Sequence, residues 1–285
     1  MGIIVTGATG QLGRLVIEEL LEKVPADQVT AVVRNKEKAA DLAAQGVRIA
    51  VADYNVPETF NGLFSSGDKV LLISSTGAGR VAQHRVVVDA AKAADVALLA
   101  YTGTAASLKA SLADDHRTTE QVIRDSGVPY VLLGNYWYHE NETYQLAQIL
   151  ARGTVVRATG EGRVSSAGRA DYAAAAAAVL TGEGHKNKTY ELGGDEAWSF
   201  AEFAAEIGRQ TGREIVYTPV SVDTFSGILT DAGVPGPFVA TLADVDASIA
   251  KGELGVLTGD LSRLIGRPPT SIADSIAAAL KALEG

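Results

Sequence analysis

The stretch Ile3-Ile4-Val5-Thr6-Gly7-Ala8-Thr9-Gly10-Gln11-Leu12-Gly13 decides the fold, because a short apolar run ends at glycines and a helical pattern follows at once. Glycine permits a sharp turn and lets the backbone approach a pyrophosphate, while the helix start offers free N–H groups and a positive dipole end. The spacing is Gly-x-x-Gly-x-x-Gly rather than Gly-x-Gly-x-x-Gly. In this strand–loop–helix context it predicts a dinucleotide-binding loop. The expected contacts are Gly7, Ala8, Thr9, Gly10, Gln11, Leu12 and Gly13.

Strand and helix signals alternate through the first half of the chain. Strands are expected at Val29–Val33, Val47–Ala52, Lys69–Ser75, Val96–Tyr101 and Val128–Leu133, with helices at Gln11–Lys23, Val81–Ala94 and His116–Ser126. The Lys69–Ser75 run is almost continuously apolar, as in a parallel strand buried on both faces. Strands separated by helices imply right-handed crossovers. The pattern predicts an α/β fold, a Rossmann-like doubly wound parallel sheet.

The alternation stops after Asn135, where aromatic residues and a glycine-containing basic stretch begin. Asp171 precedes six consecutive alanines and is expected to be the N-cap of their helix. We expect residues 1–135 to form the nucleotide-binding domain, with part of 160–195 returning to it. Residues 136–159 and 196–285 are expected to form a smaller C-terminal α/β lobe that binds the substrate.

The composition excludes several classes of function. The 285 residues include no Cys, which removes disulfides, thiolate metal sites and cysteine nucleophiles, and we expect no metal site. Lys and Arg total 25 against 34 Asp and Glu, so the formal charge is −9, which disfavours nucleic acid as a partner. No stretch resembles a membrane helix or a secretion signal, and we expect a cytoplasmic protein.

The end of the second expected strand carries the nucleotide specificity signal. An NAD site usually has an acidic residue about 20 residues after the glycine loop, bonded to the ribose 2′-hydroxyl. Arg34 stands in that place, and its planar fork suits a phosphate, so NADP(H) is favoured over NAD(H). The alternative is that Arg34 is an ordinary surface charge. Asp53, after the third strand, is placed either to meet the adenine edge or to cap the next turn.

These features, with further short motifs, resemble the NmrA-like group of atypical short-chain dehydrogenases/reductases, and within it the bacterial quinone reductases and triphenylmethane dye reductases. The further motifs are Leu72-Ile73-Ser74-Ser75, Gln83-His84, Ala100-Tyr101-Thr102-Gly103, His116-x-x-Thr119-Glu120, Trp137-Tyr138-x-Glu140-Asn141, Arg169-Ala170-Asp171-Tyr172-Ala173 and Leu264-Ile265-Gly266.

The resemblance implies additional cofactor contacts. They are Ser74, Ser75, Thr76, Tyr138, Glu140, Asn141 and Arg169. The chain departs from the family pattern at two glycines: Gly134 replaces a common Arg, and Gly103 replaces the Ser of the quinone reductase, as it does in the dye reductase. These departures bear on the substrate more than on the cofactor.

One common catalytic pair is missing from the sequence. Ordinary short-chain dehydrogenases use a Tyr with a Lys four residues later, which lowers the phenol pKa for proton exchange with the substrate. No Tyr in this chain has Lys at that spacing. A strongly basic alkoxide product needs such an acid, whereas a delocalised quinol anion or a reduced cationic dye does not. Direct hydride transfer to a conjugated acceptor is therefore favoured.

Three residues are candidates for contact with the substrate. His116 is expected near the nicotinamide, as a proton donor or hydrogen-bond partner, the alternative being a helix-start residue beside Asp114 and Asp115. Tyr136 and Trp137 follow the sixth expected strand, where a cleft is expected, and are candidates for an aromatic wall against a flat ring. Their alternative is an ordinary core cluster. His84 is expected on a helix surface.

The sequence thus predicts an NADPH-dependent reductase that transfers hydride to a quinone or similar conjugated acceptor. The alternatives are a triphenylmethane-dye-type reductase and a redox sensor that binds NADP(H) without turnover. The expected partner is a small aromatic or quinone-like molecule, and a homodimer is an option that the sequence leaves open.

Replacing Arg34 with Ala should raise the KM for NADPH at least about tenfold and change the KM for NADH little, because only NADPH carries the 2′-phosphate. Steady-state kinetics with both cofactors measure this. Equal effects on the two KM values would contradict the assignment.

Overall fold

The computed structural model describes residues 2–75, 77 and 79–284, which form two compact units with separate cores. The first unit comprises Met1–Thr104, Asp115–Asn135 and Ala170–Glu191; the second comprises Ala105–Asp114, Tyr136–Arg169 and Leu192–Gly285. The segment that returns to the first unit lies within the expected 160–195 range. The second unit is only slightly smaller than the first.

One segment falls outside its expected domain. Residues 105–114 were expected in the nucleotide-binding domain, yet they belong to the second unit. The Ser107 hydroxyl donates to the Glu253 carbonyl at 2.6 Å, and the Ser111 N–H donates to the Asp244 carboxylate at 2.6 Å. Contacts between residues this far apart in the chain have no local sequence signal.

A seven-stranded sheet forms the centre of the first unit, in the order β3-β2-β1-β4-β5-β6-β9. The strands are β1 (Ile3–Val5), β2 (Val29–Val33), β3 (Arg48–Val51), β4 (Lys69–Ile73), β5 (Leu98–Thr104), β6 (Tyr130–Asn135) and β9 (Lys188–Leu192). Every pairing from β3 through to β6 is parallel. The order reverses between β1 and β4, and ligands of such sheets bind at the carboxyl ends of the strands beside that point. The predicted Rossmann-like fold is confirmed.

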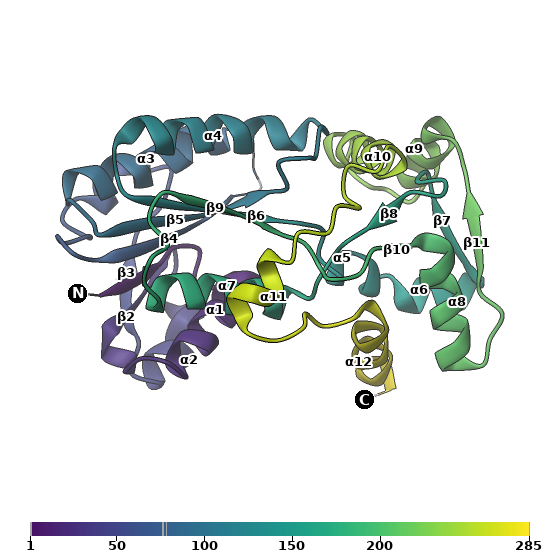
Figure 1. Cartoon of the computed structure of the whole chain (residues 1–285), viewed down its shortest axis with the longest axis horizontal. Coiled ribbons are helices and arrows are strands. Elements are labelled where there is room, and N and C mark those ends of the chain that lie inside the picture. The colour runs from purple at the N-terminus through teal and green to yellow at the C-terminus, as the bar shows by residue number, and fades with distance from the viewer. Residues whose placement is uncertain (1, 76, 78, 285) are drawn as a thin grey trace. The chain divides into compact units, whose positions relative to one another are not determined.

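Helices cover both faces of this sheet. They are α1 (Gln11–Leu21), α2 (Ala40–Ala44), α3 (Arg80–Ala93), α4 (Leu112–Ser126) and α7 (Arg169–Thr181), with 3₁₀ turns at Ala26–Gln28, Lys36–Ala39 and Pro57–Phe60. Figure 1 shows α3 and α4 above the sheet and α1, α2 and α7 below it. The upper face buries Leu72, Leu99 and Leu132 of the sheet with Val87 of α3 and Ile123 of α4. This burial is the main force that holds the layers together.

Two expected helix starts differ from the structure. The helix expected from His116 begins earlier, at Leu112, so His116 lies inside it. The alanine-rich helix begins at Arg169, which places Asp171 in the first turn and not at the N-cap. A carboxylate in the first turn still interacts favourably with the helix dipole, which explains why the residue type suits either position.

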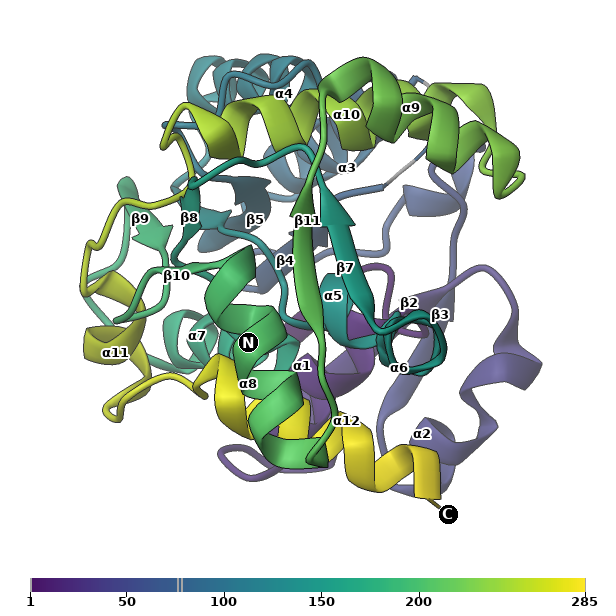
Figure 2. The ribbon, with the colours of Figure 1, turned by 90° about the vertical axis from the view of Figure 1, so that its right-hand side faces the viewer.

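The second unit is built from shorter elements. They are α5 (Glu140–Thr143), α6 (Leu146–Arg152), β7 (Thr154–Arg157), β8 (Arg163–Val164), β10 (Trp198–Ser199), α8 (Phe200–Thr211), β11 (Val216–Pro219), α9 (Val222–Asp231), α10 (Gly236–Ala250), α11 (Asp260–Ile265) and α12 (Ile272–Glu284). Figure 2 shows the parallel pair β7 and β11 side by side, with α8 beside them. Phe200, Phe203 and Ile207 of α8 are buried in this unit's core together with Val245 and Ile249 of α10. Among the described residues, no helix is long and apolar enough to cross a membrane.

Replacing Gly13 with Ala should lower the free energy of unfolding by about 1–3 kcal/mol, because the new Cβ would lie 2.4 Å from the Gly7 carbonyl oxygen. The matched control is Gly227→Ala, in α9, where a Cβ meets nothing within 4 Å. Alanine is the better helix former there, so that variant should gain about 0.5–1 kcal/mol. Urea denaturation measures both, and equal changes would contradict the packing argument.

Candidate functional site

A cavity of about 640 Å³ lies in the first unit at the carboxyl ends of β1, β2, β3 and β4. It gathers several of the predicted cofactor residues: Gly7, Thr9, Gly10, Arg34, Asp53, Ser74 and Ser75. Thr76 lies outside the described residues. The cavity stands beside the reversal of strand order, which is where a doubly wound sheet binds its nucleotide.

The glycine loop leaves the helix start open toward this cavity. Gly7 has φ +62°, in the left-handed region, and its carbonyl accepts the Gly10 N–H at 2.9 Å. Gly10 is the N-cap of α1 and has no side chain to bond the first helical N–H groups, so these remain available to a phosphate. Ala8 and Leu12 are buried and shape the loop from beneath, whereas Gln11 is exposed.

Two cations line the cavity beyond β2. They are Arg34 and Lys38, and the second was not singled out from the sequence. Both side chains are exposed, and within the described ranges no carboxylate pairs with either one. Arg14 of α1 donates to the Lys38 carbonyl at 2.7 Å and pairs with Asp41. The hydrogen bond from Arg14 to the Asp41 carboxylate lowers the pKa of Asp41. The loop is thus fixed while its two cations face the cavity without a counter-charge.

A chain of polar side chains links two sides of the cavity. The Asp53 carboxylate accepts the Asn55 N–H at 2.9 Å, so Asp53 does cap the turn that follows it. The Asn55 side-chain oxygen accepts from Gln83 at 2.9 Å, and the Gln83 oxygen accepts from the Ser75 hydroxyl at 2.6 Å. Asn55 and Gln83 therefore complete a polar rim of the cavity. Neither residue was predicted from the sequence to bind the cofactor.

His84 is wholly buried, so the expectation of a surface position was wrong. The Ser75 N–H donates to Nε2 of His84 at 3.0 Å, and Nδ1 lies 2.9 Å from the Thr119 hydroxyl oxygen. A backbone N–H can only donate, so Nε2 is unprotonated and the proton resides on Nδ1. Burial, with the charge of Arg80, lowers the pKa of His84 to about 4. Neutral His84 thus holds the Ser75 backbone at the cavity edge.

His116 is buried in a second part of this network. Its Nδ1 lies 2.7 Å from the Tyr101 hydroxyl and its Nε2 lies 3.3 Å from Arg80, which can only donate. Burial, with the charge of Arg80, lowers the pKa of His116 to about 3. Burial also raises the pKa of Tyr101. A neutral imidazole with both nitrogens engaged is a poor acid, so the geometry favours a positioning role over proton donation.

The other predicted cofactor residues lie in the second unit, where they form a cluster of their own. The Arg169 N–H donates to both oxygens of Glu140, at 2.9 and 3.1 Å, and its guanidinium lies over the Tyr138 ring at 5.0 Å. Tyr138 also forms a bridge with Ala167. Glu140 begins the short helix α5, and Asn141 is its second residue. The segment that carries these residues is therefore tied firmly to the start of α7.

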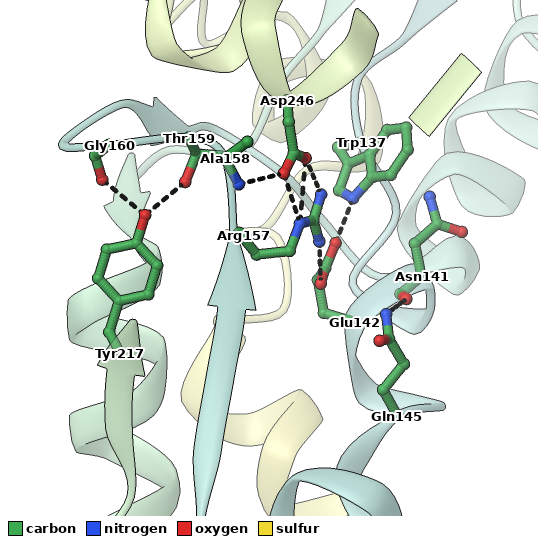
Figure 3. Close-up of polar contacts among 10 residues, drawn as sticks. All are labelled: Trp137, Asn141, Glu142, Gln145, Arg157, Ala158, Thr159, Gly160, Tyr217 and Asp246. Atoms are coloured by element: carbon green, nitrogen blue, oxygen red, sulfur yellow. Dashed lines mark hydrogen bonds and ion pairs between the residues drawn. The ribbon is translucent and has the colours of Figure 1, made fainter. Parts of the chain in front are cut away.

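The two aromatic candidates differ in burial. Tyr136 is 5% exposed and belongs to the core of the second unit, which agrees with the ordinary core reading. Trp137 is only half-buried, and its indole N–H donates to the Glu142 carboxylate at 2.8 Å. Figure 3 shows that Glu142 also contacts Arg157, which in turn pairs with Asp246 of α10. The sequence carries no local signal of this charged cluster, because Arg157 and Asp246 are 89 residues apart.

The two glycines that depart from the family pattern are direct neighbours. Gly103 of β5 and Gly134 of β6 are partners in the strand register. A Cβ on Gly103 would lie 3.1 Å from the Glu120 carboxylate, and one on Gly134 would lie 3.1 Å from the Thr104 carbonyl. A larger side chain at either position would therefore enter the same crowded region. The two departures from the family pattern affect one place in the structure.

The comparisons with known proteins agree with this geometry. A family model described as NAD(P)H-binding matches residues 7–183. The chain belongs to this NAD(P)H-binding family. The model spans the glycine loop from Gly7 and the strands β2 to β6. The predicted class, an NAD(P)H-dependent oxidoreductase, is confirmed.

Four comparisons with relatives of this NAD(P)H-binding protein are informative. It is 45% identical to quinone oxidoreductase 2 of Escherichia coli, over 96% of this chain and 97% of that one. The NADPH complex of the Escherichia coli NADPH-dependent quinone oxidoreductase superposes with a TM-score of 0.94, at 44% identity, covering 98% and 99% of the two chains. The Citrobacter sp. triphenylmethane reductase with NADP(H) gives a TM-score of 0.93 at 40% identity, covering 98% and 100%. An NmrA-like family domain-containing oxidoreductase of Aspergillus flavus is 27% identical, over 97% and 94% of the two chains. The predicted resemblance and the NADP(H) cofactor are confirmed.

Lowering the pH from 7 to 5 should destabilise the protein, by about 2 kcal/mol for each of His84 and His116. Their folded pKa values of about 4 and about 3 lie below the ordinary 6.5, so near pH 5 the unfolded chain binds protons that the folded chain does not. The stability conferred by the neutral rings is present above pH 6.5 and is lost as the pH falls below it.

Urea denaturation of the unmodified protein and of His116→Gln at both pH values isolates the share of His116. The variant should show a pH dependence that is smaller by about 2 kcal/mol. An unchanged dependence would show that His116 is not held neutral in the folded protein.

Proposed function

We propose that this chain is an NADPH-dependent reductase that transfers hydride directly to a quinone or a similar conjugated electrophilic acceptor. The observation that carries the proposal is the cavity at the carboxyl ends of β1 to β4, where Arg34 and Lys38 form no ion pair with any carboxylate that the structure describes. A 2′-phosphate would supply a counter-charge, and an NADH ribose would not. The names of two similar solved relatives, a quinone reductase and a dye reductase, support the acceptor class.

In this proposal the loop from Gly7 to Gly13 binds the pyrophosphate with backbone N–H groups. Arg34 and Lys38 bind the 2′-phosphate, Asp53 meets the adenine edge, and the Ser74–Thr76 stretch contacts the cofactor further along. Tyr138, Glu140, Asn141 and Arg169 contact the cofactor as the family resemblance implies. Trp137 provides the flat face for the acceptor, and Tyr136 supports it from the core. We also propose a cytoplasmic location, in keeping with the absence of cysteine.

The nicotinamide supplies the hydride, and with it both electrons of the reduction. A quinone that accepts this hydride becomes a quinol anion, whose charge is delocalised over the ring, and it takes one proton from water. The protein therefore needs no strong acid at the reacting atoms. This requirement suits a site in which Tyr101 has a raised pKa and His116 is neutral. We assign His116 a hydrogen-bonding role, which holds the Tyr101 hydroxyl.

A dye reductase is the second candidate, favoured by Gly103, which the family resemblance implies for the dye reductase as well. A cationic dye carbon that accepts hydride needs no proton at all, so the same site chemistry would serve. The two candidates differ in the charge of the acceptor and not in the cofactor.

The test follows NADPH absorbance at 340 nm, a general property of the cofactor, with menadione, with malachite green and with no acceptor. We expect oxidation to depend on menadione and to exceed the rate with the dye at least about tenfold. A faster reaction with the dye would favour the second candidate. Tight NADPH binding without oxidation across a wider acceptor panel would overturn both and indicate a sensor.

A further inference from the structure

A buried charged cluster of Glu142, Arg157 and Asp246 lies in the second unit, outside the cofactor cavity. Their exposed fractions are 2%, 5% and 0%. The Arg157 guanidinium donates to Asp246 through Nε, at 3.0 Å, and through Nη2, and it donates to Glu142 through Nη1 at 2.5 Å. Figure 3 shows Arg157 between the two carboxylates, with Asp246 descending from α10 and Glu142 rising from α5.

The cluster is asymmetric in charge, with one cation between two carboxylates. Burial alone would lower the pKa of Arg157, but the two carboxylates outweigh it and raise the pKa above its usual value. The face of Phe200 lies 4.4 Å from the guanidinium carbon. Two neutral N–H groups satisfy the remaining carboxylate oxygens: Ala158 donates to Asp246 at 2.7 Å and the Trp137 indole donates to Glu142 at 2.8 Å. The indole is therefore a member of the cluster, fixed by a charged acceptor that cannot turn away from Arg157.

The hydrogen bond between the Trp137 indole and Glu142 also joins the two ends of the chain segment that runs from Trp137 to Glu142. That segment carries Tyr138, Glu140 and Asn141, which the family resemblance marks as cofactor contacts. Its far side is held by the bonds from the Arg169 N–H to Glu140. The segment is thus braced at two points by charged groups. The Arg169 brace lies beside the Tyr138 ring, and the Glu142 brace bonds the flat, half-exposed indole of Trp137. A side chain of that kind is what an aromatic acceptor would stack on.

We propose that Glu142, Arg157 and Asp246 are positioning residues that lock the orientation of the Trp137 indole, and that this orientation sets which flat acceptors the enzyme reduces well. The part that concerns acceptors rests on the proposed function. The part that concerns the indole does not, because it follows from the hydrogen bonds alone.

The first experiment tests the indole without any substrate. The chain has two Trp residues, so a ¹⁵N-labelled sample gives two indole N–H cross-peaks, assigned with Trp137→Phe. In Glu142→Gln the single amide oxygen turns toward Arg157, and the indole loses its charged acceptor. The Trp137 proton should move upfield by at least about 0.5 ppm, while the Trp198 peak stays in place. An unmoved Trp137 peak would overturn the proposal.

Ser166→Ala provides the matched control. The Trp198 indole donates to the Ser166 hydroxyl at 2.8 Å, so this variant removes the equivalent bond from the other tryptophan. It should move only the Trp198 peak and leave kcat/KM for menadione within about twofold. A comparable loss of menadione reduction in this variant would show that general loosening of the unit, and not the Trp137 indole, is responsible.

The second experiment is a double-mutant cycle on kcat/KM for menadione. We expect Glu142→Gln to lower kcat/KM about tenfold, through the KM for menadione, and to leave the KM for NADPH within about twofold. In the Trp137→Phe background the same change should have almost no further effect, because the residue through which it acts is gone. Equal effects in both backgrounds would overturn the proposal.

The two proposals can fail separately. If the unmodified protein oxidises NADPH with no acceptor, the proposed function fails, while the cross-peak shift still decides whether the indole is locked. If Glu142→Gln does not fold, Asp246→Asn replaces it, since that change keeps the ion pair between Arg157 and Glu142 and leaves one carboxylate in the cluster. It should move the Trp137 peak in the same sense by a smaller amount, and no movement would again overturn the proposal.

Discussion

The close contact between Gly13 and the carbonyl of Gly7 is the constraint on which the nucleotide-binding unit depends. A methyl group at Gly13 would lie 2.4 Å from that oxygen, so only glycine lets α1 begin directly against the loop that leaves β1. The contact directs the open N-terminus of α1 to the reversal of strand order beside β1 and β4. The cavity, the cations on its rim and the Ser75 backbone all take their positions from this sheet edge.

The protein uses its cations in two opposite ways. Arg34 and Lys38 are exposed and face a cavity, and Arg157 is buried between two carboxylates. The first pair costs little to keep in water and is ready for an anion that arrives with the cofactor. Burying Arg157 without partners would cost much free energy, so its role is structural: it holds Glu142 of α5 and Asp246 of α10 together. The formal charge of −9 does not distinguish the exposed cations from the buried one.

His84 and His116 also have a structural role that depends on their charge state. His84 and His116 are buried and neutral, and each uses one nitrogen as an acceptor and the other as a donor. They act as rigid connectors between strands and helices, which only an unprotonated ring with a defined tautomer can do. Neutral rings that already bond through both nitrogens are poor acids, and this suits a reaction in which hydride transfer needs no strong acid from the protein.

Local patterns in the sequence determined the alternating parallel fold, the glycine loop and the position of Arg34, since each depends on residues within one strand–loop–helix unit. Only the tertiary structure decided which partners each side chain has. It brought Lys38, Asn55 and Gln83 to the cavity, buried His84, assigned residues 105–114 to the second unit and joined Glu142, Arg157 and Asp246 across the chain. Periodicity and spacing record which face of an element is apolar. They carry no trace of contacts between distant segments, because these depend on how whole elements pack.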